Sequence, residues 1–404
     1  MSTIVLAYSG GLDTSVLLKR LLLEGNDVIA LTADLGESDA ATGDAAADAI
    51  GAISAKARAL GARDAVALDV RERFFHEYVL PAFAANVRYE GCYPLSAALS
   101  RPLIAALLVE TARAYGADAV AHGCTGKGND QVRIELGVRA LDPNLTVRAP
   151  LRESPLSRPD AIAFAAEHGI PIAQSAAKPY SIDANLWGRS IEAGVLEDPW
   201  AAPPEDAFGW TASPQDRPGT AEEIVVLFRE GVPLVEGISG ALLLARLNAL
   251  GGRHGIGRID LIEDRVIGLK SRELYEAPAA TILLAAREAL ERLVLTRDEL
   301  RFKAGVDRKY GELVYDGLWH SPLRTAFDAF NAVSSARLSG EVRVRLYQGS
   351  ATVVGVRSPF ALYDEGLATY GAGDRFDHHA ADGFIHLAGL PLDRLAQVAA
   401  VTAG

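Results

Sequence analysis

Two patterns of apolar and polar positions alternate over the first third of the chain. Short apolar runs of the kind found in strands buried on both faces occur at 3–8, 28–33, 65–68 and 117–121. Between them lie longer segments with apolar residues at helical spacing, at 12–24, 43–60, 71–87 and 101–115. This alternation predicts an α/β fold, in which a doubly wound, mostly parallel sheet carries helices on both faces. Ligands bind beyond the carboxyl ends of the strands in such sheets.

The pattern changes near Pro150, beyond which prolines separate shorter and more mixed segments. Here we predict a helix at 279–295 and strands at 223–228, 258–263, 342–348 and 351–357. Such a mixture indicates a second domain of the α+β class. Apolar residues at helical spacing over 390–400 predict a final amphipathic helix that is suited to pack on a partner subunit.

The composition is that of an ordinary globular protein, because 49% of the 404 residues are hydrophobic and 23% are charged. A formal net charge of −12 argues against a nucleic-acid partner. Cys92 and Cys124 form neither a CxxC pair nor a Cys/His cluster, and the adjacent His378 and His379 have no further ligands, so we expect no protein metal site. We see no secretory signal and no run long enough to span a bilayer, and expect a cytoplasmic protein that binds no membrane.

The run YSGGLDTS at 8–15 joins the first predicted strand to the first predicted helix. Its two glycines let the backbone turn sharply and present N–H groups to an anion, and Ser9, Thr14 and Ser15 add hydroxyl donors. The positive end of the helix dipole points the same way. The run is neither a Walker A motif nor a GxGxxG loop. It therefore predicts a phosphate-binding loop of another kind.

Other polar stretches follow later in the chain. The run HGCTGKGNDQVR at 122–133 comes directly after a predicted strand, and its three glycines allow a ligand to approach the backbone closely. Lys127 and Arg133 are suited to offset negative charge, and Asn129 and Asp130 to bind the head group of an amino acid. The remaining stretches are KPYSIDANLWGRS at 178–190, GIGRID at 255–260, SPFALYDEGLATY at 358–370 and DGFIHLAGLPL at 382–392.

The run at 8–15 resembles the pyrophosphatase loop of enzymes that cleave ATP between the α- and β-phosphates. With the other stretches, it makes the chain similar to the argininosuccinate synthase family over essentially its whole length. That resemblance implies an arginine-biosynthesis ligase that joins L-citrulline to L-aspartate through a citrullyl-adenylate, with Mg²⁺ accompanying ATP, and a homotetrameric assembly. It also implies a nucleotide-binding domain over 1–165, a synthetase and multimerisation domain over 166–385, and an oligomerisation helix over 386–404.

The resemblance also assigns roles to individual residues. For ATP it implies Ala7, Tyr8, Ser9, Gly10, Gly11, Leu12, Asp13, Thr14, Ser15, Ala33 and Gly123. For aspartate it implies Thr125, Asn129 and Asp130, and for citrulline Tyr93, Asn129, Arg133, Ser181, Ser190, Glu263 and Tyr275. Catalytic roles are expected for Asp13, Asn129 and Arg133. No dedicated covalent nucleophile is needed, because the reaction demands mostly alignment and charge neutralisation.

Three positions depart from the residues that are usual in the family. Ala98 stands where a serine that contacts citrulline is expected, Glu37 where glutamine is frequent, and Glu273 where glycine is usual. These departures leave open a paralogous ligase that joins a different ureido or amide compound to an amino acid. A non-catalytic oligomeric protein that retains the fold is the alternative of another class, and pyrophosphate release distinguishes it. An amidating ligase is disfavoured by the lack of a glutaminase-like Cys/His arrangement, and a tRNA-modifying enzyme by the acidic charge.

Overall fold

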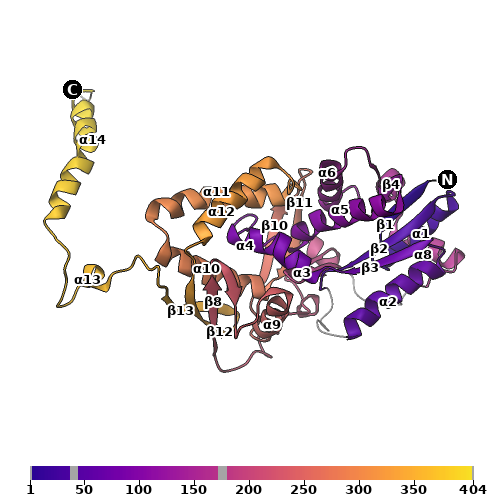
Figure 1. Cartoon of the computed structure of the whole chain (residues 1–404), viewed down its shortest axis with the longest axis horizontal. Coiled ribbons are helices and arrows are strands. Elements are labelled where there is room, and N and C mark those ends of the chain that lie inside the picture. Colours follow the sequence, from indigo (N-terminus) through magenta and orange to yellow (C-terminus); the bar gives the residue numbers. More distant parts are fainter. Residues whose placement is uncertain (1, 37–43, 172–179, 403–404) are drawn as a thin grey trace. The chain divides into compact units, whose positions relative to one another are not determined.

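The computed structural model describes residues 2–36, 44–171 and 180–402, and the chain forms two compact units, 1–360 and 361–404. The first unit begins with a parallel sheet in the strand order β3-β2-β1-β4-β5 (Figure 1). Its strands are β1 Thr3–Ala7, β2 Asp27–Asp34, β3 Asp64–Asp69, β4 Ala119–Ala121 and β5 Thr146–Arg148. The associated helices are α1 Leu12–Leu23, α2 Asp44–Ala59, α5 Ser96–Tyr115, α6 Asp130–Leu141, α7 Pro150–Glu153 and α8 Arg158–Glu167. The predicted α/β fold is confirmed.

Helices cover both faces of this sheet, as the continuous apolar strands predicted. Ile4 and Leu6 of β1 belong to the buried cluster that includes α1, α2 and α8, whereas Val5 belongs to the cluster that includes α5. Successive residues of a strand point to opposite faces, so each strand needs apolar side chains at every position. The stretches at 8–15 and 122–133 follow directly after β1 and β4 of this sheet.

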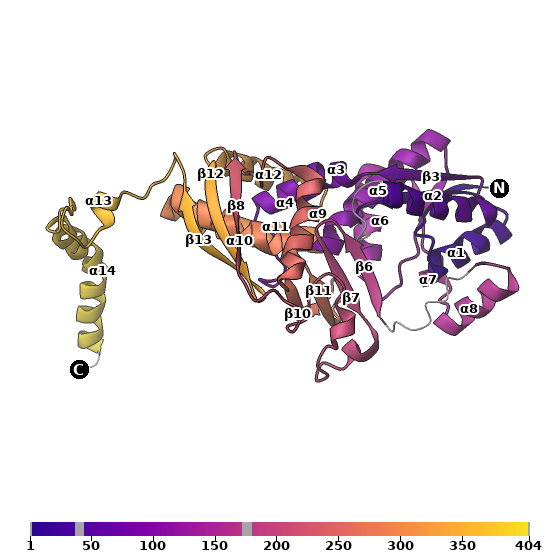
Figure 2. The same ribbon diagram turned by 90° about the horizontal axis from the view of Figure 1, so that it is seen from below.

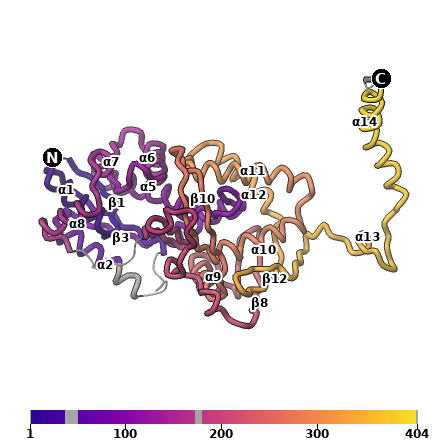
Figure 3. Tube along the Cα trace, turned by 180° about the vertical axis from the view of Figure 1, so that it is seen from behind, coloured from indigo at the N-terminus to yellow at the C-terminus, as the bar shows by residue number. Residues whose placement is uncertain are grey.

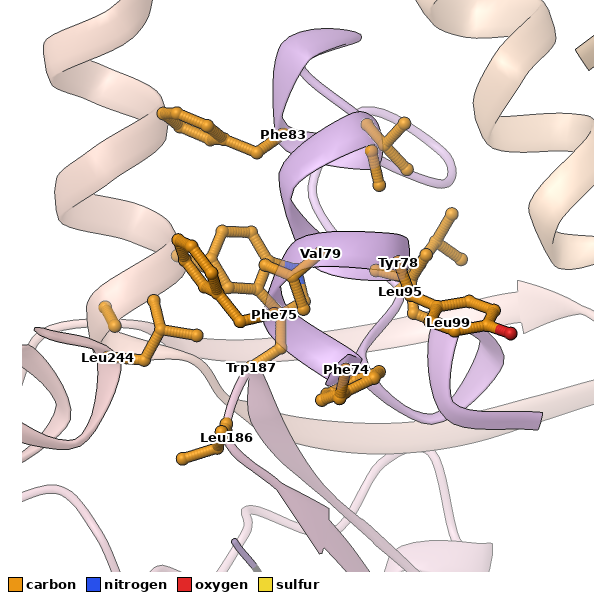
Figure 4. Close-up of a cluster of buried hydrophobic side chains, with 14 of the residues drawn as sticks. Phe74, Phe75, Tyr78, Val79, Phe83, Leu95, Leu99, Leu186, Trp187 and Leu244 are labelled. Carbon is orange, nitrogen blue, oxygen red and sulfur yellow. The ribbon is translucent and has the colours of Figure 1, made fainter. Parts of the chain in front are cut away.

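The helix predicted at 71–87 is wrong as a single element. The structure has α3 Arg71–Phe74, a π-helical turn at Phe75–Val79 and α4 Leu80–Ala84. Pro81 has no N–H to continue the α-helical ladder, and the turn before it widens so that the N–H of Leu80 donates to the Phe75 carbonyl. The wide turn directs aromatic side chains into one buried cluster (Figure 4), whose labelled members include Phe74, Phe75, Tyr78, Phe83, Leu99, Trp187 and Leu244.

The helix predicted at 101–115 begins earlier, at Ser96. Leu95, directly before it, has a left-handed backbone with φ of 64°. The hydroxyl of Tyr93 accepts a hydrogen bond from the N–H of Ala97 at 3.0 Å, so an aromatic side chain satisfies a first-turn amide. This cap has no signature in the sequence, which is why the start of α5 was misplaced. The change matters because it puts Ala98 inside the helix.

Two antiparallel sheets make up the rest of the first unit, in the orders β10-β11-β7-β6 and β13-β12-β8-β9. The strands of the first are β6 Ser181–Asn185, β7 Gly188–Glu192, β10 Arg258–Asp264 and β11 Lys270–Glu276. Those of the second are β8 Glu222–Arg229, β9 Val232–Leu234, β12 Gly340–Tyr347 and β13 Ser350–Arg357 (Figure 2). The helices are α9 Gly240–Arg253, α10 Pro278–Val294, α11 Arg297–Tyr315 and α12 Pro322–Ser335, with α10 packed on β12 and β13 (Figure 3).

The second unit holds α13 Glu365–Ala368 and α14 Ala380–Thr402, so the predicted C-terminal helix is present and longer than 390–400. Several large apolar side chains on α14 are exposed in the single chain, namely Phe384, Ile385, Leu387, Leu392 and Leu395. Within the described residues, no helix combines the length and the apolar character needed to cross a membrane.

Candidate active site

The predicted phosphate loop follows β1 and adopts a backbone that only glycine accepts easily. Gly10 has φ of +75°, and a Cβ atom there would lie 3.1 Å from Cγ2 of Ile53 on α2. α1 then begins at Leu12 without a side-chain hydrogen bond to cap it. The first N–H groups of a helix have no partner within the helix, so this end of α1 is suited to bind an anion.

Side chains around the loop add donors and positive charge. The hydroxyl groups of Ser9 and Thr14 lie 3.1 Å apart, and those of Tyr8 and Ser15 lie 3.0 Å apart. Lys56 of α2 donates a hydrogen bond of 2.7 Å to the carbonyl of the first loop glycine. Burial lowers the pKa of its ammonium. Sequence analysis missed this lysine, because it comes from a helix more than forty residues along the chain.

A cavity of about 370 Å³ opens beside the loop, at the carboxyl ends of β1, β2 and β4. One wall is apolar, with Leu31, Leu35, Ile53 and Ile104 among its members. The residues predicted for ATP that line it are Ala7, Tyr8, Ser9, Thr14, Ala33 and Gly123. An apolar wall that faces a glycine loop at a helix N-terminus suits a purine base joined to phosphates.

The remaining loop residues lie at the other side of the turn. Asp13 lines a neighbouring cavity of about 300 Å³, together with Thr125, Lys127 and Arg152. The side chain of Leu12 packs against the apolar core beneath α1. Thr125, which is predicted to bind aspartate, therefore lies next to the phosphate loop. The cationic side chains of Lys127 and Arg152 line the same cavity.

The register of the sheet β10-β11-β7-β6 brings most of the predicted citrulline residues to one face. Residues directly opposite each other in antiparallel strands point to the same side, as do alternate residues along a strand. Glu263 lies opposite Ser271, Tyr275 opposite Ser190, and Ser190 opposite Asp183. One face therefore carries Ser181, Asp183, Ser190, Glu192, Glu263, Glu273 and Tyr275.

Glu263 is the centre of a buried hydrogen-bonded cluster on this face, and its exposed fraction is 1%. The hydroxyl groups of Tyr275 and Tyr315 donate to its two oxygens at 2.5 and 2.6 Å. The ring of Tyr93 stacks on that of Tyr275, with 3.7 Å between centroids. Burial raises the pKa of Glu263, and the two tyrosine hydroxyls and Arg133 oppose that rise.

The stretch at 122–133 meets this cluster at the start of α6. Asn129 donates to the Tyr315 hydroxyl at 2.9 Å and accepts from the N–H of Val266 at 2.9 Å. Arg133 donates through Nε to the Tyr315 carbonyl and through Nη1 to Asp130, each at 2.9 Å. Its Nη2 atom is buried without a hydrogen-bond partner among the described residues. A buried guanidinium nitrogen in that state favours an oxygen ligand.

Arg101 of α5 connects this cluster to the larger cavity. Its Nη2 atom donates to Asp130 at 2.7 Å and to Asp183 at 2.6 Å, and both Arg101 and Asp183 line the cavity. Burial opposes ionisation of Asp130, but Arg101 and Arg133 outweigh it and lower the pKa of that carboxyl group. Ser190 donates a longer hydrogen bond of 3.4 Å to the Asp183 carbonyl. Arg101 and Asp130 thus connect the cavity beside the loop to Arg133 and the hydrogen-bonded cluster around Glu263.

The other positions that the sequence singled out lie at the edge of this face, inside a helix or outside the described residues. Ser181 is exposed on β6, at the edge of the shared face. Ala98 is fully buried inside α5. Glu37 lies outside the described residues. Asp183 lies in the stretch at 178–190 and Arg101 three residues after Ala98, but the sequence assigned neither of them a role. Tyr315 comes from a segment without any motif, and its long-range contacts with Glu263 and Asn129 identify it.

Glu273 is a further acidic residue on the shared face, with a side chain that is 13% exposed. Its Oε1 atom accepts from Arg265 at 3.2 Å, and its Oε2 atom lies 3.2 Å from the Tyr275 hydroxyl. Burial, followed by the negative charges of Glu263 and Glu192, raises the pKa of Glu273 to about 8. At neutral pH this carboxyl group is therefore mostly protonated.

Replacing Glu273 by glutamine should make the stability less sensitive to pH. An unfolded glutamate has a pKa of about 4.3, so between there and about pH 8 the native carboxyl takes up a proton on folding. Native stability then falls as pH rises through that window. Glutamine does not titrate, and we expect Tm(E273Q) − Tm(wild type) to increase by about 2–5 °C between pH 5 and pH 8. Scanning calorimetry checks this. A difference that stays constant, or that Glu341→Gln on β12 reproduces, would contradict it.

Comparisons with known proteins cover nearly the whole chain. Residues 3–171 match the family described as arginosuccinate synthase N-terminal HUP domain, and residues 180–395 match the arginosuccinate synthase C-terminal domain. A protein from Gloeobacter violaceus named argininosuccinate synthase is 51% identical over 400 residues, which are 98% of each chain. Proteins of the same name from Symbiobacterium thermophilum and Geobacillus kaustophilus are also 51% identical, over 96% of this chain and 96% and 94% of theirs.

Among solved structures, a 4-thiouridine synthetase in complex with RNA and ATP superimposes with a TM-score of 0.31 and 18% identity. The match covers 42% of this chain and 41% of that one. A likeness this distant says nothing about the chemistry of the present site.

Proposed function

Because this chain belongs to the argininosuccinate synthase family, we propose that it joins L-citrulline to L-aspartate with cleavage of ATP to AMP and pyrophosphate. The observation that carries the proposal is the continuity of the site: a phosphate loop, an apolar cavity and a buried Glu263–Tyr315–Arg133 cluster meet through Arg101. An ATP-dependent ligase needs these two binding regions side by side, because both substrates of the first step must be aligned before reaction.

ATP binds with its adenine against Ala33 and the apolar wall, and with its phosphates at the loop. The residues that hold it are Ala7, Tyr8, Ser9, Gly10, Gly11, Leu12, Asp13, Thr14, Ser15, Ala33 and Gly123. Mg²⁺ accompanying ATP would supply positive charge at the phosphates. Within the described ranges, no three His, Cys, Asp or Glu side chains gather as a metal site. Asp13, next to the phosphates, is the residue suited to orient that hydrated ion.

Citrulline occupies the face around Glu263. The carboxylate of Glu263 binds the substrate's ammonium, held for this purpose by Tyr275 and Tyr315. Arg133 binds a substrate oxygen through its free Nη2 atom. Tyr93 stacks behind Tyr275, while Ser181 and Ser190 border the same face. Ala98 contributes no hydroxyl, so its neighbours bind citrulline without it.

The reaction then runs in two displacements. The ureido oxygen of citrulline attacks the α-phosphorus, the bond to the β-phosphate oxygen breaks, and pyrophosphate leaves. The aspartate amine next attacks the ureido carbon, loses a proton and displaces AMP. Thr125, Asn129 and Asp130 hold aspartate, and Asn129 and Arg133 align the two partners because each contacts Tyr315 or Asp130. The protein forms no covalent intermediate, and its contribution is alignment and charge stabilisation.

We also propose that the protein works in the cytoplasm as a homotetramer without a nucleic-acid or membrane partner. The exposed apolar side chains of α14 support an assembly role for 386–404. The formal charge of −12 supports the lack of a nucleic-acid partner. The functional division into 1–165 and 166–385 is part of the same proposal, and the two family matches meet close to that boundary, between 171 and 180.

Pyrophosphate release is the assay that tests the function. With ATP, Mg²⁺, citrulline and aspartate we expect release and formation of argininosuccinate. Omitting citrulline should abolish release, whereas omitting aspartate should leave at most a single turnover, because the adenylate then waits for its second substrate. Mass spectrometry identifies the product. Turnover only with another ureido or amide acceptor would establish the paralogous ligase instead, and protein that binds ATP without any turnover would contradict both.

A further inference from the structure

On the shared face of β6, β7, β10 and β11, the carboxyl groups of Asp183, Glu192 and Glu273 have no task in the two displacements. Of these three, Glu273 is the one that contacts Tyr275. It lies on β11 two residues before Tyr275, opposite Leu261, so its side chain shares a face with Glu263. A buried carboxyl group beside a second one is costly unless protons or cations compensate the charge. The carboxyl groups of Glu263 and Glu273 therefore form a site that favours binding of a cationic ligand.

The Tyr275 hydroxyl links the two carboxyl groups, because it contacts both of them. The Tyr275 hydroxyl has a single proton, and its bond of 2.5 Å to Glu263 is shorter than the 3.2 Å contact to Glu273. The proton thus goes to Glu263. Oε2 of Glu273 then satisfies the phenol oxygen only if it carries a proton of its own, and Oε1 accepts from Arg265. The resulting chain runs from Glu273 through Tyr275 to Glu263.

Charged groups from every neighbouring element bear on this chain. Arg265, in the turn between β10 and β11, donates to Glu192 of β7 at 2.5 Å and to the carbonyl of Lys127 at 3.0 Å. Arg265 is thus already engaged by Glu192 and does not compensate Glu273 fully. The titratable and charged groups facing the site are Tyr93, Arg133, Glu192, Glu263, Arg265, Tyr275 and Tyr315.

We propose that Glu273 is a positioning residue of the acceptor's ammonium subsite, which releases its proton when a cationic acceptor binds beside Glu263 and so favours acceptors that carry a free ammonium group. This inference rests on the proposed function, because it takes the acceptor to bind at Glu263. The physical reason is linkage. A cation near a protonated acid stabilises the ionised form, and the ionised form therefore binds the cation more tightly.

The test compares the KM for citrulline of the wild type and Glu273→Gln between pH 6.5 and pH 8.5. Glutamine can keep the contacts with Arg265 and Tyr275 but has no proton to release. We expect the ratio KM(E273Q)/KM(wild type) to be smallest at pH 6.5 and to reach about three to ten at pH 8.5, with kcat changed less than twofold. Asp260→Asn removes an exposed carboxylate on the opposite face of β10 and should give a ratio that does not vary with pH.

The outcomes distinguish a failure of the proposed function from a failure of the role proposed for Glu273. A wild-type protein that releases no pyrophosphate with citrulline at any pH overturns the proposed function itself. Turnover with a KM ratio that is flat across the pH range overturns only the role of Glu273, as does an effect confined to kcat. The pH dependence of the Tm difference, predicted above, shows independently whether Glu273 titrates in this range, so a folding defect of the variant cannot be mistaken for either result.

Discussion

Replacing Glu263 by glutamine should raise the KM for citrulline by about a hundredfold or more, with a smaller effect on the KM for ATP. Glu263 is 1% exposed and accepts hydrogen bonds from two tyrosines, so its carboxyl group is fixed in position and shielded from water. Glutamine has nearly the same shape but no charge, and its amide group meets a tyrosine hydroxyl that is oriented to donate. The substrate's ammonium then loses its counter-ion in a site where water does not replace it.

Initial-rate kinetics with citrulline varied at saturating ATP and aspartate measure this effect. Asp260→Asn is the matched control, since it removes a carboxylate of the same strand that lies on the opposite face and pairs with Arg272. We expect the control to change KM less than twofold. A Glu263→Gln protein whose KM for citrulline stays within threefold of the wild type would place the ammonium elsewhere.

Replacing Gly10 by alanine should lower kcat/KM for ATP by about a hundredfold. With φ of +75°, Gly10 holds a conformation that costs an L-residue about 1–2 kcal/mol. The new Cβ would also lie 3.1 Å from Ile53, which lines the cavity. The loop relieves this strain by turning its peptide groups, and that movement takes N–H donors away from the phosphates. Pyrophosphate release should fall with every acceptor.

Gly25 supplies the control for this substitution, because it follows the other end of α1 with φ of +84° and open space around its Cβ position. Gly25→Ala imposes a comparable backbone cost at a distance from the phosphates. Both variants should lose a similar amount of thermal stability, but only Gly10→Ala should lose ATP use. Equal losses of activity would mean that destabilisation, and not the loop geometry, explains the result.

The parallel sheet and the phosphate loop were predictable because each depends on local properties. Strands buried on both faces need an apolar residue at every position, and this leaves runs such as those at 3–8 and 28–33. The loop needs glycine where φ is positive and hydroxyl donors close in sequence, and YSGGLDTS supplies both. The strands of the second part were predicted only in part, because β6, β7, β9 and β11 were missed. β6, β7 and β9 have five residues or fewer, and β11 (KSRELYE) is mostly polar, so none of them leaves a long apolar run.

The helix boundaries show where local reasoning fails. The pattern at 71–87 is apolar enough for one helix, but Pro81 has no N–H to donate, and the chain forms a π-helical turn before it. The start of α5 depends on the Tyr93 hydroxyl, which caps the amide of Ala97 from outside the helix. Neither the width of a turn nor an aromatic cap can be read from periodicity.

By itself, the sequence determined the α/β class, a glycine loop suited to bind phosphate and most of the residues that we propose for the site, because the residues of a motif lie within a few positions of one another. Only the tertiary structure decided which of them act together. Strand register places Glu263, Glu273 and Tyr275 on one face, and a slip of one residue would turn each of them away. Tyr315 and Arg101 join that face from separate helices. Such contacts depend on how whole elements pack, and that information is spread over the entire chain.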